Sequence, residues 1–397
     1  MRSRRLLTRI GGATAVLALA AAALTACNDE ADPAAEDEPF KLGALIPLSG
    51  IEDHVGESML AATEIAVEEI NEDGGVLGRE IELIVEDEAS DPETAVERAR
   101  KLIREDEVTF IVGTLTSAVR NAVVEVTAPE GVPLFNPTYY EGGLCQDYVF
   151  STGALPNQQI EPFVPWIMEN LGESFYFIGS DYAWPRDSYE HIRRLVEDAG
   201  GEIVGEEYVP FGVTDYSASI QRILDADPDV LYPLIAGVDG ITFWNQLAGF
   251  DFEGHRVSHS VSEAITQGLE PEVAEGIVSA APYFMVLDNE ANQEFLERYH
   301  EERPGEYVDT FGEGMYSATH LFAIGAERAG SFEIEELREG LQGATFEAPQ
   351  GTVTIDPETQ HASLGFHIAE ATGNEWDESE ILVSQEGIEP ASDCGEL

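Results

Sequence analysis

The order of the structural elements can be followed in residues 41–85, which read KLGALIPLSGIEDHVGESMLAATEIAVEEINEDGGVLGREIELIV. The apolar run 42–48 is typical of a buried parallel strand. Residues 56–71 then predict a helix, because apolar side chains recur on one face at helical spacing. These side chains are Met59, Ala62, Ala66 and Ile70. Gly74-Gly75 ends the helix, and the apolar run 81–85 predicts a second strand, so the stretch forms one βαβ unit.

The same alternation continues along the chain. Asp91-Pro92 is typical of an N-cap followed by a first-turn proline, and predicts a helix that ends at Arg104. Further apolar runs predict strands at 108–112, 132–135, 175–178, 202–209, 230–235 and 257–261, with helices from 117, at 185–199 and at 217–226. The step Asp73-Gly74-Gly75 recurs, with one residue inserted, at 198–201, which indicates two similar halves.

We therefore predict an α/β fold of two Rossmann-like lobes with parallel sheets, joined by a multi-segment hinge. The 397-residue chain has room for two such lobes, and its hydrophobic content of 43% is normal for a globular protein. We expect residues 40–156 with 285–350 to form lobe 1, and residues 157–284 with 351–397 to form lobe 2.

The N-terminal segment predicts export. Four arginines precede a short apolar run at 13–23, and Leu24-Thr25-Ala26-Cys27 follows, which resembles a bacterial lipobox. We expect residues 1–26 to be a lipoprotein signal peptide, Cys27 to carry the lipid and residues 27–39 to be an acidic flexible tether. The alternative is an ordinary signal peptide that contains a cysteine. Either way the run is too short to span a bilayer, and a lipid anchor would hold the protein at the extracytoplasmic face of the cell membrane.

The net charge of −57 excludes several classes of partner. Lysine and arginine total 20 against 77 aspartates and glutamates, so nucleic acid, which binds basic patches, is not an expected ligand. A field that steers ligands is one interpretation, but the acids are spread along the whole chain. Halophilic adaptation, in which dispersed carboxylates keep a protein soluble in brine, explains the spread better.

Two cysteines remain beside Cys27. Cys145 and Cys394 are expected to pair, since leftover cysteines in an oxidising compartment usually form a disulfide. Two unpaired thiols are the alternative.

Polar segments follow each predicted strand, where ligands bind in parallel sheets. They are residues 113–117, 136–142, 179–186, 236–239 and 262–264. Ser117 alone is explained equally well as a helix cap. The recurrence of such segments at the same topological place in both halves favours a ligand cleft between two lobes.

Several segments of the chain resemble a known family. Lys41-Leu42-Gly43, Leu48-Ser49-Gly50 and the run 69–78 resemble the opening of periplasmic leucine/isoleucine/valine-type (type I) solute-binding proteins. Other segments resemble the urea and short-chain amide branch of these ABC transporter substrate-binding proteins. They are Thr116-Ser117 with Arg120, Pro137 with 140–142, 154–159, 179–182 with Pro185-Arg186, Ser262-Glu263, 274–276 and 348–351.

The resemblance implies a protein that captures urea or a short-chain amide by cleft closure and delivers it to a membrane ABC permease. Donors at Thr116, Ser117 and Thr138 would hold an oxygen, Tyr182 would cover it, and Glu263 or Asp239 would accept from N–H groups. Leu115 and Asn136 complete the expected ligand-binding set, and Leu115 departs from the family, whose members carry an aromatic residue there. A branched-chain or other amino acid is the alternative ligand, and a ligand-sensing partner of a membrane receptor is the alternative role.

We do not expect an enzyme. The chain has no Gly-x-Ser-x-Gly, His-Glu-x-x-His or phosphate-loop motif, and we expect no cofactor and no metal site. His255 and His259 flank a predicted strand and do not share a helical face, so they are interpreted as structural histidines.

Overall fold

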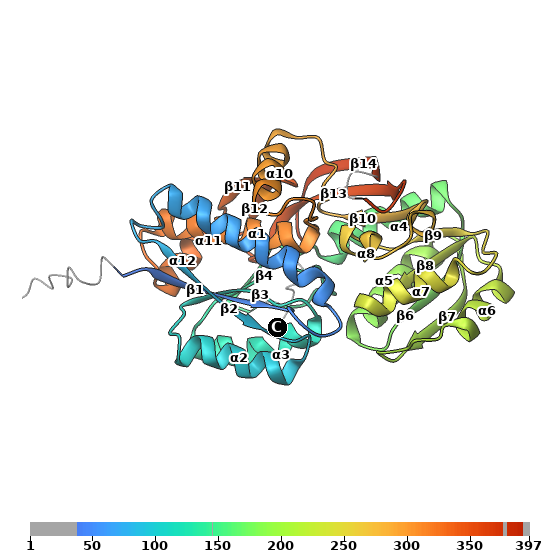
Figure 1. The fold of residues 1–397 in the computed structure, drawn as a ribbon, viewed down its shortest axis with the longest axis horizontal. Coiled ribbons are helices and arrows are strands. Elements are labelled where there is room, and N and C mark those ends of the chain that lie inside the picture. The colour runs from blue at the N-terminus through green and yellow to red at the C-terminus, as the bar shows by residue number, and fades with distance from the viewer. Residues whose placement is uncertain (1–37, 145, 376–378, 392–397) are drawn as a thin grey trace, which may run out of the picture. The chain divides into compact units, whose positions relative to one another are not determined.

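Two β-sheets organise the computed structural model, which describes residues 38–144, 146–375 and 379–391 (Figure 1). The first sheet has five parallel strands in the order β2-β1-β3-β4-β5. They are β1 (Phe40–Ile46), β2 (Ile81–Asp87), β3 (Phe110–Gly113), β4 (Leu134–Asn136) and β5 (Val149–Ser151). Their carboxyl ends lie along one edge of the sheet, where a ligand site is expected.

Helices cover both faces of this sheet, which is why β1 is an almost unbroken apolar run. Leu42, Ala44 and Ile46 pack with one cluster of buried residues, and Leu45 packs with another on the opposite face. The first face is covered by α1 (Asp53–Glu72), α11 (Thr310–Ala329) and α12 (Ile334–Leu341), with α10 (Glu290–Glu302) against α1. The second face is covered by α2 (Pro92–Arg104) and α3 (Ser117–Glu130).

The second sheet has a parallel part and an antiparallel extension. Strands β7 (Glu202–Val209), β6 (Ser174–Ser180), β8 (Val230–Leu234), β9 (His255–Val257) and β10 (Ile277–Ala281) run parallel in that order. The chain's last strands continue the sheet antiparallel from β10. They are β13 (Ala362–Ala371), β12 (Gly351–Ile355) and β11 (Thr345–Ala348), with β14 (Ser379–Ile388) paired to β13.

Helices also cover the parallel part of the second sheet on both faces. On one side lie α4 (Pro156–Asn170) and α5 (Ala183–Asp198). On the other lie α6 (Ser217–Ala226) and α7 (Gly237–Leu247), together with the short helices α8 (Glu263–Gln267) and α9 (Pro271–Ala274). The two parallel sheets confirm the predicted α/β class.

The structure differs from the sequence prediction in several places, of which three bear on the site or on the sheets. The strand expected at 257–261 ends at Val257, because the Ser258 hydroxyl donates to the carbonyl of Pro233 and the chain turns away. The N-cap of α3 is Thr116, whose side chain accepts from the Val119 amide, so Ser117 is already inside the helix. The antiparallel strands after residue 344 were not predicted. The Asp91 cap of α2, by contrast, is confirmed by its bond from the Thr94 amide.

Several expectations concern parts of the chain outside the described residues. They are the signal peptide at 1–26, the lipidated Cys27, most of the tether, and the disulfide between Cys145 and Cys394. Within the described residues, no helix is both long enough and apolar enough to cross a membrane.

Candidate ligand-binding site

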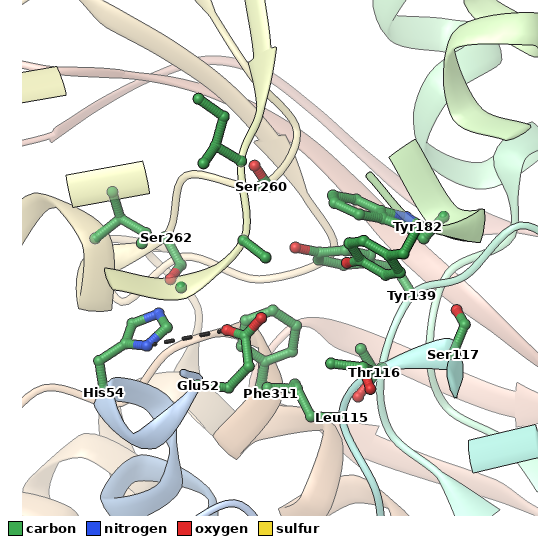
Figure 2. Close-up of a pocket in the computed structure, with 16 residues that line it drawn as sticks. Glu52, His54, Leu115, Thr116, Ser117, Tyr139, Tyr182, Ser260, Ser262 and Phe311 are labelled. Atoms are coloured by element: carbon green, nitrogen blue, oxygen red, sulfur yellow. Dashed lines mark ion pairs between the residues drawn. The ribbon is translucent and has the colours of Figure 1, made fainter. Parts of the chain in front are cut away.

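A pocket lies where the carboxyl ends of both sheets meet (Figure 2). The pocket has a cavity volume of about 50 Å³. The segments that follow β1, β3 and β4 line one side, together with Phe311 of α11, and the segments that follow β6, β8 and β9 line the other. The lining residues are Glu52, His54, Leu115, Thr116, Ser117, Thr138, Tyr139, Tyr182, Trp184, Ile235, Ala236, Gly237, Ser260, Ser262, Ile265 and Phe311.

The segment after β3 reaches the pocket through a strained turn. Gly113 has φ +127°, and a Cβ there would lie 2.2 Å from the Leu45 carbonyl oxygen. Thr114 follows with φ +66°, a region that β-branched residues rarely adopt. Its amide donates to the Leu45 carbonyl and its own carbonyl accepts from the Thr138 hydroxyl at 3.0 Å. Backbone strain of this kind is typical of functional sites.

The segment after β4 is held rigidly at Thr138. The Asn136 side-chain amide donates to the Thr138 carbonyl at 2.7 Å, and a Cβ on Gly153 would lie 1.9 Å from the same oxygen. Asn136, which the sequence placed among the ligand-binding residues, therefore supports the pocket wall and does not line it.

Most hydroxyl groups of the pocket donate their protons to the protein. Ser117 donates to the Glu141 carboxylate at 2.6 Å, Thr138 to the Thr114 carbonyl, and Ser262 to the Asp309 carboxylate at 3.1 Å. The Ser258 hydroxyl donates its one proton to the Pro233 carbonyl. In the 2.8 Å contact between the Ser258 and Ser260 hydroxyls, Ser260 is therefore the donor. A hydroxyl has one proton and two lone pairs, so these four side chains present acceptors to the pocket.

Thr116 is the exception among the hydroxyl groups. Its oxygen accepts from the Val119 amide, so its proton is available to a ligand. The hydroxyls of Tyr139 and Tyr182 also keep their protons, because burial raises both pKa values well above the usual range. The pocket therefore offers three hydroxyl donors and a larger number of acceptors.

Glu52 is the acidic side chain of the pocket. It is 8% exposed, and burial, with the nearby Asp239 and Asp53 charges, raises its pKa to about 7. His54 Nδ1 lies 4.0 Å from its Oε2, the pair drawn dashed in Figure 2. Burial lowers the His54 pKa to about 4, so the imidazole is neutral near pH 7 and the contact is not an ion pair there.

The two walls touch at the mouth of the pocket. The Val238 amide donates to the Ile51 carbonyl at 3.3 Å. Gly237 has φ +56°, and a Cβ at this position would lie 2.0 Å from the same carbonyl oxygen. Only glycine permits this approach.

Five of the eight predicted binding residues line the pocket: Leu115, Thr116, Ser117, Thr138 and Tyr182. The structure does not bring Asp239 and Glu263 into it. The Asp239 carboxylate turns to accept from the Gly212 amide at 2.7 Å. Glu263 accepts from the Met285 amide at 2.7 Å and lines a separate cavity of about 20 Å³. Burial raises the pKa of Glu263 to about 8.

Sequence reasoning missed several of the lining residues, among them Glu52, His54, Ser260 and Phe311. Glu52 and His54 follow the first strand, so the rule that found the other segments would have found them too. Phe311 comes from α11, which follows no strand of the first sheet, and the sequence carries no signal for its place. Among the described residues, no group of three or more histidines, cysteines or acids is arranged to hold a metal ion.

Comparisons with known proteins agree with this architecture. A family described as "Periplasmic binding protein" matches residues 39–375. The leucine-, isoleucine-, valine-, threonine-, and alanine-binding protein of Pseudomonas aeruginosa is 25% identical over 345 residues, which cover 84% of this chain and 90% of that protein.

Two solved structures share the fold. A solute binding protein of an ABC transporter from Rhodopseudomonas palustris, in complex with 3,4-dihydroxybenzoic acid, has a TM-score of 0.80 at 23% identity. The match covers 89% of this chain and 99% of that one. A branched-chain amino acid transporter substrate binding protein from Streptococcus pneumoniae, in complex with isoleucine, has a TM-score of 0.79 at 23% identity. There the coverage is 88% and 100%.

Proposed function

Because this chain belongs to the periplasmic binding protein family, we propose that it is the substrate-binding protein of an ABC importer and captures a small polar solute rich in N–H groups. Urea or a short-chain amide is the first candidate. The observation that carries this proposal is the direction of the pocket's hydroxyl groups. Ser117, Thr138, Ser260 and Ser262 all donate into the protein and turn lone pairs toward the ligand.

An amide complements this arrangement. Its N–H groups would donate to the hydroxyl oxygens and to Glu52, and its carbonyl would accept from Thr116. The space of about 50 Å³ is room for a few water molecules, which suits a solute of few heavy atoms. A micromolar ligand needs about −8 kcal/mol in total, which several desolvated hydrogen bonds supply.

An amino acid is the second candidate, and the names of the relatives favour it. The proteins from Pseudomonas aeruginosa and Streptococcus pneumoniae are described as amino-acid binding. A carboxylate would have to use the Thr116 hydroxyl and the first amides of α3, where the helix dipole favours negative charge. It would also have to avoid Glu52, which makes this candidate the weaker one.

Capture proceeds by closure in this proposal. We place lobe 1 at residues 40–156 with 285–350 and lobe 2 at 157–284 with 351–397, so that three chain crossings form the hinge. The contact between Ile51 and Gly237-Val238 belongs to the closed form. The protein binds its ligand and transforms nothing, and the closed form docks onto the membrane permease. We also propose that Cys27 carries a lipid anchor.

A thermal-shift series tests the function. The mature protein is incubated at low and high salt with urea, acetamide, formamide, leucine and glutamate. We expect stabilisation by the amides at both salt concentrations and a higher melting temperature at high salt. A response to the amino acids alone would overturn the amide proposal, and turnover of an amide would overturn the binding role.

A further inference from the structure

The described residues that line the pocket carry negative charge and no positive charge near pH 7. Among the described residues that line it, none is lysine or arginine, and His54 is neutral near pH 7. Glu52 is therefore a buried acid that faces the ligand without a counter-charge from the protein. Burying an unpaired charge is unfavourable, and it is tolerated where a partner arrives from outside.

Glu52 is also poorly solvated by the protein. From the described part of the chain its carboxylate accepts no hydrogen bond, and His54 Nδ1 lies 4.0 Å from its Oε2. Its Oε2 lies 3.2 Å from the Cβ position of Gly237, at the mouth that closes over the ligand. The charges of Asp239 and Asp53 add negative potential around it, so the field at this carboxylate attracts a cation.

Aromatic rings complete the surroundings. Tyr139 lies 5.4 Å from Trp184 and 5.2 Å from Phe311, centroid to centroid, and Tyr182 lies 6.2 Å from Trp184. All four rings line the pocket, and Figure 2 labels Tyr139, Tyr182 and Phe311. The faces of such rings attract organic cations, and they exclude the water that would otherwise weaken an ion pair.

We propose that the ligand is a small organic cation, an amidinium, guanidinium or ammonium ion of amide size, held by Glu52, the pocket rings and the hydroxyl lone pairs. This inference rests on the proposed capture function and narrows the class of its solute. Ser117, Thr138 and Glu52 offer acceptors to the N–H groups of such an ion. A carboxylate would meet the Glu52 charge and the same lone pairs, so zwitterions and aromatic acids are disfavoured.

Isosteric ligands separate charge from shape. Acetamidinium, acetamide and acetate share one geometry and differ in charge, and guanidinium pairs with urea in the same way. Titration calorimetry at pH 8 and constant ionic strength is expected to show acetamidinium at least about tenfold tighter than acetamide, guanidinium tighter than urea, and no binding of acetate.

Glu52→Gln tests the counter-charge, because it keeps the shape of the side chain and removes the charge. Affinity for acetamidinium is expected to fall at least about 100-fold, while affinity for acetamide stays within threefold. Glu57→Gln is the matched control, since Glu57 is exposed on α1, which begins directly after Glu52, and its substitution changes the net charge equally. It is expected to leave both affinities unchanged, and the melting temperature of each variant reports its folding.

The outcomes distinguish this inference from the proposed function. If acetamide and urea bind and their cationic isosteres do not, the proposal of a cationic ligand is overturned and the capture of amides stands. Binding of leucine alone would overturn both. The proposal of a cationic ligand would also be overturned if acetamidinium, guanidinium and ammonium all failed to bind the folded protein. It would equally be overturned if Glu52→Gln and Glu57→Gln lost the same affinity for acetamidinium.

Discussion

The two walls of the pocket differ in what they offer a ligand. The wall on the first sheet carries Glu52, the Thr116 donor and the acceptors of Ser117 and Thr138. The wall on the second sheet is mainly aromatic and aliphatic, with Tyr182, Trp184, Ile235, Ala236 and Ile265. Its two serines, Ser260 and Ser262, donate their protons to the protein and not to the pocket. The difference indicates a division of labour: the first wall selects the ligand by charge and hydrogen bonds, and the second buries it.

Gly237→Ala is expected to have an effect about as large as that of Glu52→Gln, because it prevents the walls from meeting. The added Cβ would lie 2.0 Å from the Ile51 carbonyl oxygen, and alanine is disfavoured at φ +56° by about 1–2 kcal/mol. Together these effects are expected to weaken ligand binding by roughly 100-fold in calorimetry. Gly249→Ala serves as control, since φ there is not positive and its nearest neighbour is 3.3 Å away. Equal affinities for the two variants would show that the mouth need not close.

Substitutions that remove one hydroxyl from each wall compare the walls directly. Thr138→Val removes an acceptor on the selecting wall and is expected to weaken binding about tenfold, the value of a hydrogen bond to a charged group. Tyr182→Phe keeps the ring of the burying wall and is expected to cost about threefold or less. The reverse order would contradict the division of labour. Melting temperatures are measured in parallel because Thr138 also bonds the Thr114 carbonyl.

The pH dependence of binding tests the charge on the first wall. The pKa of Glu52 is raised to about 7, so the carboxylate is mostly protonated at pH 6 and mostly ionised at pH 8. A cation pairs only with the ionised form, so affinity is expected to fall about tenfold from pH 8 to pH 6. The groups that face Glu52 are Asp53 and His54 on α1, Glu88 after β2, Tyr139, Tyr182, and Asp239 on α7.

His54 does not titrate between pH 6 and pH 8, because burial lowers its pKa to about 4. Burial raises the pKa of Glu88 well above its usual range, and Glu88 is not among the residues that line the pocket. The Glu52→Gln variant should therefore show a flat profile between pH 6 and pH 8. A slope that survives in this variant would assign the titration to another group.

Glu263→Gln is expected to have the smallest effect on binding, under twofold, because Glu263 lies outside the pocket. Its effect on stability is different. Burial raises the Glu263 pKa from its ordinary value of 4.5 to about 8, so the stability that the protonated group contributes is fully present below about pH 4.5 and is lost as the pH rises through about 8. The neutral variant is therefore expected to melt at the same temperature as the wild type near pH 4 and at least about 3 °C above it at pH 9. A loss of ligand affinity would return Glu263 to the binding set.

The fold and part of the site could be predicted because both depend on short-range patterns. Apolar runs mark buried parallel strands, and the segments after them converge at one edge of each sheet. This rule located Leu115, Thr116, Ser117, Thr138 and Tyr182. The direction of a single side chain was not predictable. Glu263 is the first residue of a short helix, and its carboxylate turns to the Met285 amide from a distant part of the sequence.

The roles of two other side chains also depend on contacts made only in the fold. Ser117 keeps its place in the pocket but presents an oxygen and no proton, because Glu141 accepts that proton at 2.6 Å. Phe311 reaches the pocket from α11, and no pattern in the sequence connects this helix with the strand ends.

The rings around Glu52 have a consequence for selectivity against inorganic ions. A protein with a net charge of −57 gathers sodium and potassium at its surface, and a buried carboxylate would otherwise be their natural destination. A small metal ion must shed its hydration shell to enter, and aromatic walls return little of that loss. An organic cation arrives already weakly hydrated and loses less. The rings thus act as a dehydration filter, which keeps the carboxylate available for the solute while counterions crowd the exterior.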